Sequence, residues 1–328
     1  MNNPLFPVRA NPRDAGRHGI YGPRMDQSQR LLWPFLAAFA GVGFLSLMDA
    51  QMKAASLAAG VYTASLLRSL LAAGIAAPIW LARGARWPKP AVLRLHVERG
   101  VVSAFMALTF FYALTKLPLA EAIAISFMAP LLALYFAHLL LGEQIRRSAI
   151  GASALGLAGT LVIVSGRLGR AEVNEDIWLG LASLLVSAML YAYNFIVIRK
   201  QSQVAGPIEV ATFHAGVGGL VQLLAAPFLF VLPGPNAMLS IGYAAILTVA
   251  GSMAIAWAYA RAEAQVLVPM EYTGFVWAAL FGWLFFREPV TLPTILGVAL
   301  IVAACWIAAP RARRRKRTAS SVDGTGLP

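Results

Sequence analysis

The 328-residue chain has 59% hydrophobic and only 12% charged residues, and its formal net charge is +13. Ordinary soluble domains carry about twice that share of charged residues, so the composition argues against a soluble domain. The basic residues lie in the tails and in alternate loops, without a nucleic-acid motif, so we expect no nucleic-acid partner. The only cysteine, Cys305, excludes a disulfide framework and a thiolate metal cluster.

The chain begins with an Arg- and Pro-rich stretch, residues 1–30, which we expect to be a disordered cytoplasmic tail. Ten apolar segments follow, at roughly 31–52, 61–82, 99–117, 120–141, 148–166, 177–198, 208–231, 237–260, 265–286 and 291–309. A segment of about 20 apolar residues is long enough to cross the hydrocarbon core of a bilayer. Residues 310–328 form a second basic tail. The fold class predicted is an all-α membrane protein with ten transmembrane helices.

The distribution of Lys and Arg predicts the orientation of the chain. With the N-terminus inside and ten spans, 21 of the 27 basic residues fall on the inner side, 5 fall on the outer side and Arg68 lies within a span. Cytoplasmic loops carry such an excess of Lys and Arg. We therefore expect both termini to be cytoplasmic.

The two halves of the chain, residues 31–166 and 177–309, carry an internal repeat. The fourth segment ends in LLLGE and the ninth in LFFRE, which aligns Glu143 with Glu288. The helix after each has two small residues four positions apart, a spacing that lets helix backbones approach closely in lipid: Ala154 with Ala158, and Ala299 with Ala303. Because five spans is an odd number, the two halves are predicted to insert in opposite orientations, as in many transporters. A chance likeness between apolar helices is the alternative.

The acidic residue Glu271 lies about seven residues into the ninth segment, just after Pro269 and beside Tyr272. A charge at bilayer depth costs at least about 2.5–3.5 kcal/mol, so it should have a partner or a task. Proline kinks a helix and frees a backbone carbonyl, and Pro130 does the same in the fourth segment. A carboxylate and a free carbonyl facing a wet cavity would recognise an amine or bind a proton. The alternative is that Glu271 pairs with an arginine and holds the bundle together.

Four other charged residues lie within or at the ends of the predicted spans. Arg68, in the second segment, is interpreted as a counter-ion for a carboxylate on the substrate or on a helix, with a structural ion pair as the alternative. Asp49 and Lys53 share one face near the outer end of the first helix, at a spacing that favours an ion pair, and are candidates for a gate. Glu121 begins the fourth segment, where a carboxylate suits a helix N-terminus; a gate or substrate role is the alternative.

Aromatic and amide side chains within the spans complete the candidate set: Tyr112, Tyr191, Tyr193, Asn194, Trp257 and Tyr259. Aromatic belts at the two membrane interfaces are the alternative for the aromatic residues. Asn194 is different, because an unpaired amide in hydrocarbon is unfavourable. His138 and His214 stand alone on apolar helices, which is typical of helix–helix hydrogen bonds. Glu143 and the Arg287–Glu288 pair stand at helix ends and are interpreted as interfacial.

No catalytic pattern is recognised in the sequence: it has no paired-aspartate metal motif, HExxH, GxSxG or Walker loop. We therefore expect no enzyme activity, no metal, no cofactor and no ATP-driven transport by this chain alone. The side chains favour a passive or ion-coupled carrier, with protons as a candidate coupling ion.

Residues 31–309 resemble the EamA-type branch of the drug/metabolite transporter superfamily. The resemblance is carried by the ten spans in two halves, by Lys53 and Arg68, and by Pro130 with Glu143 and the corresponding FFRE ending. The second half departs from the pattern, because Phe275 aligns with Pro130. The resemblance implies a bacterial inner-membrane secondary carrier of small polar metabolites, amino-acid-like, amine-bearing or nucleoside-like. The stretch PMEYTGFVWAALFGWLFF is similar to S-adenosylmethionine uptake carriers.

The resulting hypothesis is an alternating-access carrier with a central cavity, in which Glu271 and Arg68 bracket a zwitterionic or amine-bearing substrate. Two other classes stay open. A membrane-embedded enzyme or lipid-handling protein would have a cavity open to lipid, with clustered acids or histidines. A non-transporting sensor or scaffold would lack a continuous polar cavity. The expected partners are the small-molecule substrate and the lipid bilayer, with the chain as a monomer or weak homo-oligomer.

Overall fold

The computed structural model describes residues 27–141, 147–168, 175–201, 203–259, 261 and 270–308, and within these ranges the regular structure is entirely helical. The first half contains α1 (Gln27–Ala59), α2 (Val61–Ala82), α3 (Pro90–Lys116), α4 (Leu119–Ser126), α5 (Ala129–Leu141) and α6 (Arg147–Leu168). The second half contains α7 (Glu175–Gln201), α8 (Pro207–Leu223), α9 (Ala226–Leu229), α10 (Pro235–Tyr259), α12 (Thr273–Phe286) and α13 (Leu292–Ala308). Six of the described stretches are long and apolar enough to cross a membrane, and α6, α12 and α13 contain shorter apolar stretches. The prediction of an all-α protein with membrane-spanning helices is confirmed.

Two helices extend beyond the segments predicted for them. Helix α1 begins at Gln27, inside the stretch expected to be a disordered tail, and continues past Lys53 through the helix-favouring sequence AASLAA. It ends at Ala59, and the next residue, Gly60, has a φ of 82°, which suits glycine. Helix α3 begins at Pro90, because the fixed φ of proline suits the first turn of a helix. Arg99, expected at the inner end of the loop before the third segment, therefore lies within α3.

Two predicted segments are divided in the structure. The fourth is interrupted at Phe127–Met128, so that Pro130 falls in the first turn of α5, where its missing N–H is tolerated. The seventh is interrupted at Leu224–Ala225, between α8 and α9. Pro269 and Glu143 lie outside the described residues.

Most contacts between a helix of the first half and a helix of the second half have a counterpart in which the two halves are exchanged. If each helix is matched to the one five spans later, the α1–α10 contact corresponds to α7–α3, the α3–α8 contact to α10–α2, and the α5–α7 contact to α12–α1. The α6–α13, α2–α8 and α4–α12 contacts each correspond to themselves. All six kinds of contact are among the most extensive in the structure. The packing therefore follows an approximate twofold exchange of the two halves.

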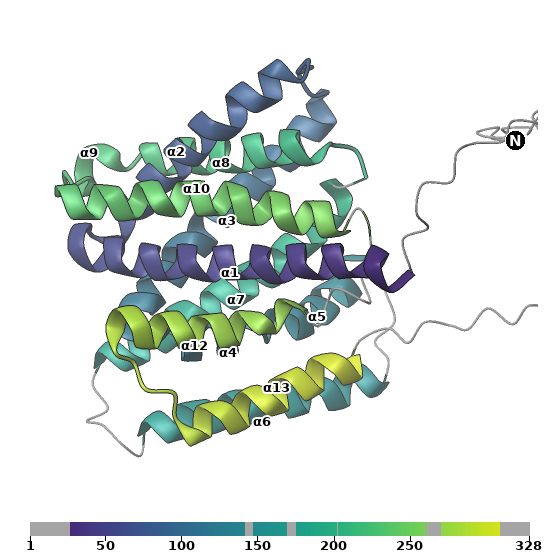
Figure 1. Ribbon diagram of the computed structural model, residues 1–328, viewed down its shortest axis with the longest axis vertical. Helices are drawn as coiled ribbons and strands as arrows, with labels where there is room; N and C mark the ends of the chain where they lie inside the picture. Colours follow the sequence, from purple (N-terminus) through teal and green to yellow (C-terminus); the bar gives the residue numbers. More distant parts are fainter. Residues whose placement is uncertain are drawn as a thin grey trace, which may run out of the picture.

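Helices α6 and α13 lie side by side at one end of the stack of helices in Figure 1. Their backbones are in close contact at Gly159 and Gly297, because a methyl group at Gly159 would lie 2.6 Å from the Gly297 carbonyl oxygen. Small residues thus allow this approach, as expected in lipid. The alanines that were predicted to allow this close approach do not lie at the α6–α13 contact. All four are exposed: Ala154, Ala158, Ala299 and Ala303.

The buried core is concentrated where α1 and α3 end and where α2, α4 and α10 begin. Met52, Ala64, Leu114, Leu119 and Ile241 are all fully buried in this cluster. The first turn of α1 and the last turn of α13 lie on the opposite side of the bundle (Figure 1). One side of the bundle is therefore densely packed with apolar side chains.

Candidate functional site

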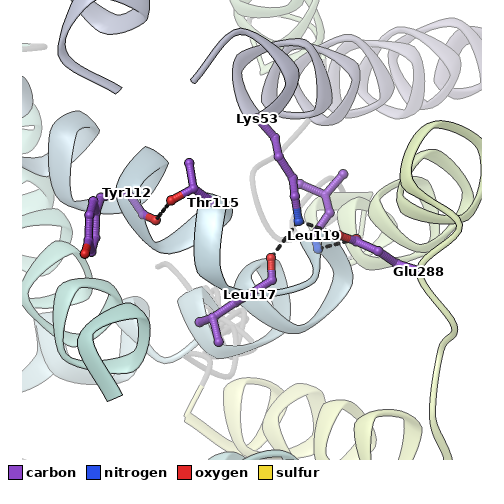
Figure 2. Close-up of polar contacts among 6 residues, drawn as sticks. All are labelled: Lys53, Tyr112, Thr115, Leu117, Leu119 and Glu288. Carbon is purple, nitrogen blue, oxygen red and sulfur yellow. Dashed lines mark hydrogen bonds and ion pairs between the residues drawn. The ribbon is translucent and has the colours of Figure 1, made fainter. Parts of the chain in front are cut away.

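Lys53 lies at the densely packed end and joins the two halves. It is 5% exposed, and its Nζ donates a hydrogen bond of 2.7 Å to the Leu117 carbonyl oxygen, between α3 and α4. It also forms an ion pair with Glu288, which follows α12 (Figure 2). The other carboxylate oxygen of Glu288 accepts a hydrogen bond of 2.7 Å from the Leu119 N–H. A buried charge is stable when it is paired in this way, with its remaining hydrogen bonds satisfied.

The backbone after α12 places the Glu288 carboxylate in this network. Arg287 has a φ of 55°, and the Glu288 N–H then donates to the Gly282 carbonyl oxygen at 3.1 Å. A side chain at Gly282 would lie 2.9 Å from a Glu288 carboxylate oxygen, so glycine leaves room for it. The interfacial interpretation of Glu288 is therefore incomplete: the residue is an ion-pair partner of Lys53 across the halves.

A second group of charges lies within the bundle. The carboxylate of Asp49 on α1 and the guanidinium of Arg68 on α2 are close enough for their charges to interact. The Arg68 guanidinium lies 5.3 Å from the centre of the Phe111 ring on α3, a cation–π contact. Asp49 and Arg68 are both half-buried. The structure thus places Asp49 near Arg68, and gives Lys53 a partner on the other half.

The same interior group includes residues of α3, α7 and α8. His214 is within electrostatic range of both Arg68 and Arg99. The Tyr191 hydroxyl is within range of Arg99 and of the carboxylates of Asp49 and Glu271. The Tyr191 side chain keeps 37% of its surface accessible, and its ring stacks on Phe195. We refer to Asp49, Arg68, Arg99, Tyr191, His214 and Glu271 as the interior cluster.

Several polar atoms near the interior cluster are buried and have no hydrogen-bond partner in the described part of the chain: Arg68 Nε, Arg99 Nε, His214 Nδ1 and Asn194 Oδ1. A buried polar group without a partner costs about 1–3 kcal/mol, and native proteins contain few of them. Four such atoms on α2, α3, α7 and α8 are therefore a feature that needs an explanation.

A hydrogen-bonded chain connects the interior cluster to the ends of α7 and α8. Arg99 donates to Gln201 Oε1 at 2.7 Å, and Gln201 Nε2 lies 2.6 Å from His96 Nδ1. His96 Nε2 lies 2.9 Å from a carboxylate oxygen of Glu209. Gln201 and His96 are both fully buried. This chain fixes the position of Arg99 on α3.

The aromatic candidates are distributed over the molecule. The Tyr112 ring lies away from the Lys53–Glu288 pair (Figure 2). It is 5.8 Å from Lys116 Nζ, and it is the neighbouring Phe111 that contacts Arg68. The Trp257 ring lies 4.1 Å from the Arg261 guanidinium. Tyr272 packs edge-on against Phe127. None of these three contacts includes a residue of the interior cluster.

The remaining candidates are placed as follows. Glu271 is exposed, in a helical turn just before α12. Glu121 is buried in the first turn of α4, where a carboxylate oxygen accepts a hydrogen bond of 3.4 Å from the Thr294 hydroxyl on α13. Asn194 is 2% exposed on α7. The Tyr259 side chain, like Pro269, lies outside the described residues. Within the described ranges, no group of three or more His, Cys, Asp or Glu residues is arranged to hold a metal ion.

A family model described as the EamA-like transporter family matches residues 32–165 and 178–309, which are most of the chain. The chain belongs to the EamA-like transporter family. Two matched stretches of similar length also agree with a two-repeat architecture. Together with the apolar helices, this membership makes the chain a multi-pass bacterial membrane protein.

Curated EamA-type relatives are named as transporters. A pseudopaline exporter of Pseudomonas aeruginosa is 29% identical over 274 residues, which cover 82% of this chain and 93% of the relative. A riboflavin transporter of Rhizobium johnstonii is 26% identical, covering 68% and 72% of the two chains. An S-adenosylmethionine uptake transporter of Rickettsia prowazekii is 24% identical, covering 64% and 69%. A solved crystal structure with 21% identity covers 84% of this chain and 97% of its own chain with a TM-score of 0.60, which shows a shared fold.

Sequence reasoning missed three members of the two charged groups. Glu288 was interpreted as interfacial, Arg99 was assigned to a loop, and His214 was expected to make a helix–helix hydrogen bond. For Arg99, the Pro90 start signal for α3 could have moved the residue into a helix. For Glu288 and His214, the sequence carries no signal of which distant side chains face them.

Proposed function

We propose that this EamA-family chain is an alternating-access secondary transporter for a small polar metabolite in the bacterial inner membrane, with both termini in the cytoplasm. Ten spans would be arranged as two inverted five-helix halves. The exchanged contacts between the halves support this arrangement, as does the common side of the α1 start and the α13 end (Figure 1). Inverted repeats of this kind surround a midplane substrate site in many transporters.

The observation that carries the proposal is the interior cluster. Its charged members come from α1, α2, α3 and the turn before α12, so they belong to both halves. Tyr191 lies within range of the Asp49 and Glu271 carboxylates and keeps accessible surface, as a side chain lining a water-filled cavity would. Ionisable residues at this depth in a membrane protein mark substrate or ion pathways. The densely packed end with Lys53 and Glu288 would then be the closed outer gate of an inward-facing state.

The substrate class follows from the charges of the cluster and from the relatives. The relatives are named for pseudopaline, riboflavin and S-adenosylmethionine, three unlike small metabolites. In this chain Arg68 offers a cation within range of Asp49 and His214, and Glu271 offers a carboxylate within range of Tyr191. We propose an amino-acid-like, amine-bearing substrate whose amine is bound on the Glu271 side. Protons are the proposed coupling ion, with Glu271 as their carrier.

The test begins by identifying the substrate from metabolite profiles of cells with and without the protein. Flux of that metabolite is then measured in proteoliposomes for the wild-type protein and for Glu271→Gln at several pH values. Loss of flux, or loss of its pH dependence, is the expected result. Glu175→Gln is the matched control, because Glu175 is an exposed carboxylate at the start of α7. Undiminished and equally pH-dependent flux in Glu271→Gln would remove Glu271 from the mechanism.

A further inference from the structure

Four polar side chains near the start of α3 form a hydrogen-bonded network between the two halves. Arg99 donates to Gln201 Oε1 at 2.7 Å, and Gln201 Nε2 lies 2.6 Å from His96 Nδ1. His96 Nε2 lies 2.9 Å from a Glu209 carboxylate oxygen. We refer to His96, Arg99, Gln201 and Glu209 as the junction network. Because α3 belongs to the first half and α7 and α8 to the second, the network joins the halves at the end of α3 away from Lys53.

The donors and acceptors of the junction network allow one arrangement of protons. Every nitrogen of an arginine side chain is a donor, so Gln201 must direct its carbonyl oxygen toward Arg99. The NH2 group of the same amide then faces His96 and donates to Nδ1. A ring nitrogen that accepts carries no proton, so the proton of His96 is on Nε2, beside the Glu209 carboxylate. The contacts therefore define His96 as a neutral imidazole with its proton on Nε2.

A second proton on His96 is incompatible with this arrangement. The protonated Nδ1 would be a donor and would face the NH2 group of Gln201, which is also a donor. The Gln201 amide would have to turn its carbonyl oxygen toward His96, and its NH2 group would then face Arg99. Among the described residues Gln201 is the hydrogen-bond acceptor for Arg99, whose Nε has no partner there. Protonation of His96 therefore removes the hydrogen bond that holds Arg99 to α7.

The packing around His96 restricts how this conflict can be relieved. His96 and Gln201 are 0% and 1% exposed, so both contacts are shielded from water. The imidazole ring is stacked on the Phe213 ring of α8, with the ring centres 4.5 Å apart. Trp80 and Trp87 pack edge-on against the same Phe213 ring. Because these rings hold the imidazole in place, a change in its protonation has to be met by the Gln201 amide.

The charged groups around His96 come from both halves. The Glu209 carboxylate on α8 contacts Nε2, and its side chain is 21% exposed, which gives water access to this side of the network. Arg99 lies on α3 itself and reaches His96 through the amide on α7. The Glu98 carboxylate, also on α3, accepts from the Tyr193 hydroxyl on α7. The described contacts from α2 and the loop after it are aromatic. A doubly protonated His96 would thus form an ion pair with Glu209, while Arg99 would lose its acceptor.

We propose that His96 is a proton-binding site, and that a proton from water on its Nδ1 transfers the Gln201 carbonyl oxygen from Arg99 to His96. The transfer releases Arg99 from α7, while the contact between His96 and Glu209 persists as an ion pair between α3 and α8. Histidine is the side chain that ordinarily changes its charge between pH 5 and 8. The role of this site in a transport cycle rests on the proposed function, to which it adds a proton site besides Glu271 that changes the contact between the halves.

The proton positions can be measured by 15N NMR of histidine in the full-length protein, purified and reconstituted in lipid. The chain has four histidines, so the His96 signals are assigned by elimination with His18→Gln, His138→Gln and His214→Gln. At pH 8 we expect a protonated Nε2 and an unprotonated Nδ1. As the pH is lowered to 5, Nδ1 should become protonated as well. A protonated Nδ1 at pH 8, or an Nδ1 that is still unprotonated at pH 5, would overturn the proposal.

A double-mutant cycle tests whether Arg99 competes with the proton for Gln201. Arg99→Met removes the competing donor, so His96 should bind its second proton at least about tenfold more tightly. In a Gln201→Met background there is no amide to exchange, and the effect of Arg99→Met should fall to about threefold or less. Equal effects in the two backgrounds would mean that the arginine acts through its charge alone, and would overturn the exchange. Arg94→Met, which removes an exposed charge on the same helix, is the matched control.

Gln201→Glu provides a second variant if Arg99→Met does not fold. A glutamate side chain accepts at both oxygens, so Arg99 and His96 Nδ1 can donate to it at the same time. His96 should then be protonated on both nitrogens at pH 8, whereas the wild-type protein is not. An unprotonated Nδ1 in Gln201→Glu at pH 8 would overturn the assignment of Gln201 as the exchanging group.

This experiment is separate from the test of transport. The NMR measurement does not require flux, so a protein that shows the expected proton positions but moves no metabolite would overturn the proposed function alone. A protein that transports its substrate while His96 Nδ1 is protonated at pH 8 would overturn the proton site alone.

Discussion

Lys53 and Arg68 are two basic residues inside the same bundle, on consecutive helices, but their surroundings differ. Lys53 is almost fully buried, with a carboxylate and a backbone carbonyl as hydrogen-bond acceptors. Arg68 is half-buried, and among the described residues its side chain makes a ring contact and a longer-range interaction with Asp49 but no hydrogen bond. A charge whose hydrogen bonds are satisfied by the protein stabilises one packed arrangement, whereas a charge with free donors is available to a ligand.

Lys53 and Arg68 look alike in the sequence, as basic residues within apolar helices, but their different surroundings indicate different roles. The Lys53 site joins the end of α1, the α3–α4 connection and the residue after α12, so it holds the two halves together at one end. The Arg68 guanidinium lies against the Phe111 ring on α3, and its Nε has no hydrogen-bond partner among the described residues. We therefore expect substitutions at Lys53 to change stability first, and substitutions at Arg68 to change substrate handling first.

The largest effect on stability is expected for Lys53→Met. Removing one partner of a buried ion pair leaves Glu288 without its counter-charge, which costs about 3–5 kcal/mol of unfolding free energy. The measurement is reversible unfolding of the purified protein in detergent. Lys89→Met is the matched control, because Lys89 is exposed in the loop before α3.

A double variant identifies the origin of this cost. In Lys53→Met combined with Glu288→Gln both charges of this pair are removed, and the glutamine can still accept from the Leu119 N–H. Most of the stability is expected to return. If the double variant is as unstable as the sum of the two single variants, then Lys53 and Glu288 do not act as a pair.

Arg68→Gln is expected to reduce transport more than it reduces unfolding stability. Loss of one charged partner of a bound carboxylate costs about 2 kcal/mol or more of binding free energy, or roughly 30-fold in affinity. Flux of the identified metabolite at low concentration should fall accordingly, while unfolding stability changes much less than in Lys53→Met. Arg94→Gln, an exposed position on α3, provides the control. A loss of stability as large as that of Lys53→Met would show that Arg68 has a structural role, and would contradict the proposed difference between Arg68 and Lys53.

The sequence predicted the parts of this picture that depend on local patterns. The lengths of the apolar segments predicted where the helices lie. The energetic cost of a charge in lipid identified Asp49, Lys53, Arg68 and Glu271 as candidates for a functional or structural role. Local spacing could not assign partners. Asp49 and Lys53 are four residues apart, yet the described contacts direct Lys53 to Glu288, 235 positions away, and Asp49 toward Arg68.

The residues that escaped prediction are those fixed by tertiary packing. His214 enters the interior cluster because Gly100 and Gly219 let α3 and α2 approach α8 closely. Ala154 and Ala158 have the spacing of a helix–helix interface, but both are exposed. The side of α6 that contacts α13 is the side that carries Gly159. A helix of apolar residues on all sides gives no periodic signal for which face is inside.

The smallest effect is expected at another ion pair between the halves, Lys116–Asp176, which serves as a comparison for Lys53–Glu288. Lys116 Nζ at the end of α3 lies 2.6 Å from an Asp176 carboxylate oxygen at the start of α7. The Asp176 side chain is 57% exposed, so water can solvate either charge when its partner is removed. Asp176→Asn should leave the unfolding temperature unchanged and should not reduce flux. A clear loss of stability in this variant would mean that charge pairing between the halves matters even where water reaches it, and burial would then no longer explain why Lys53 and Lys116 differ.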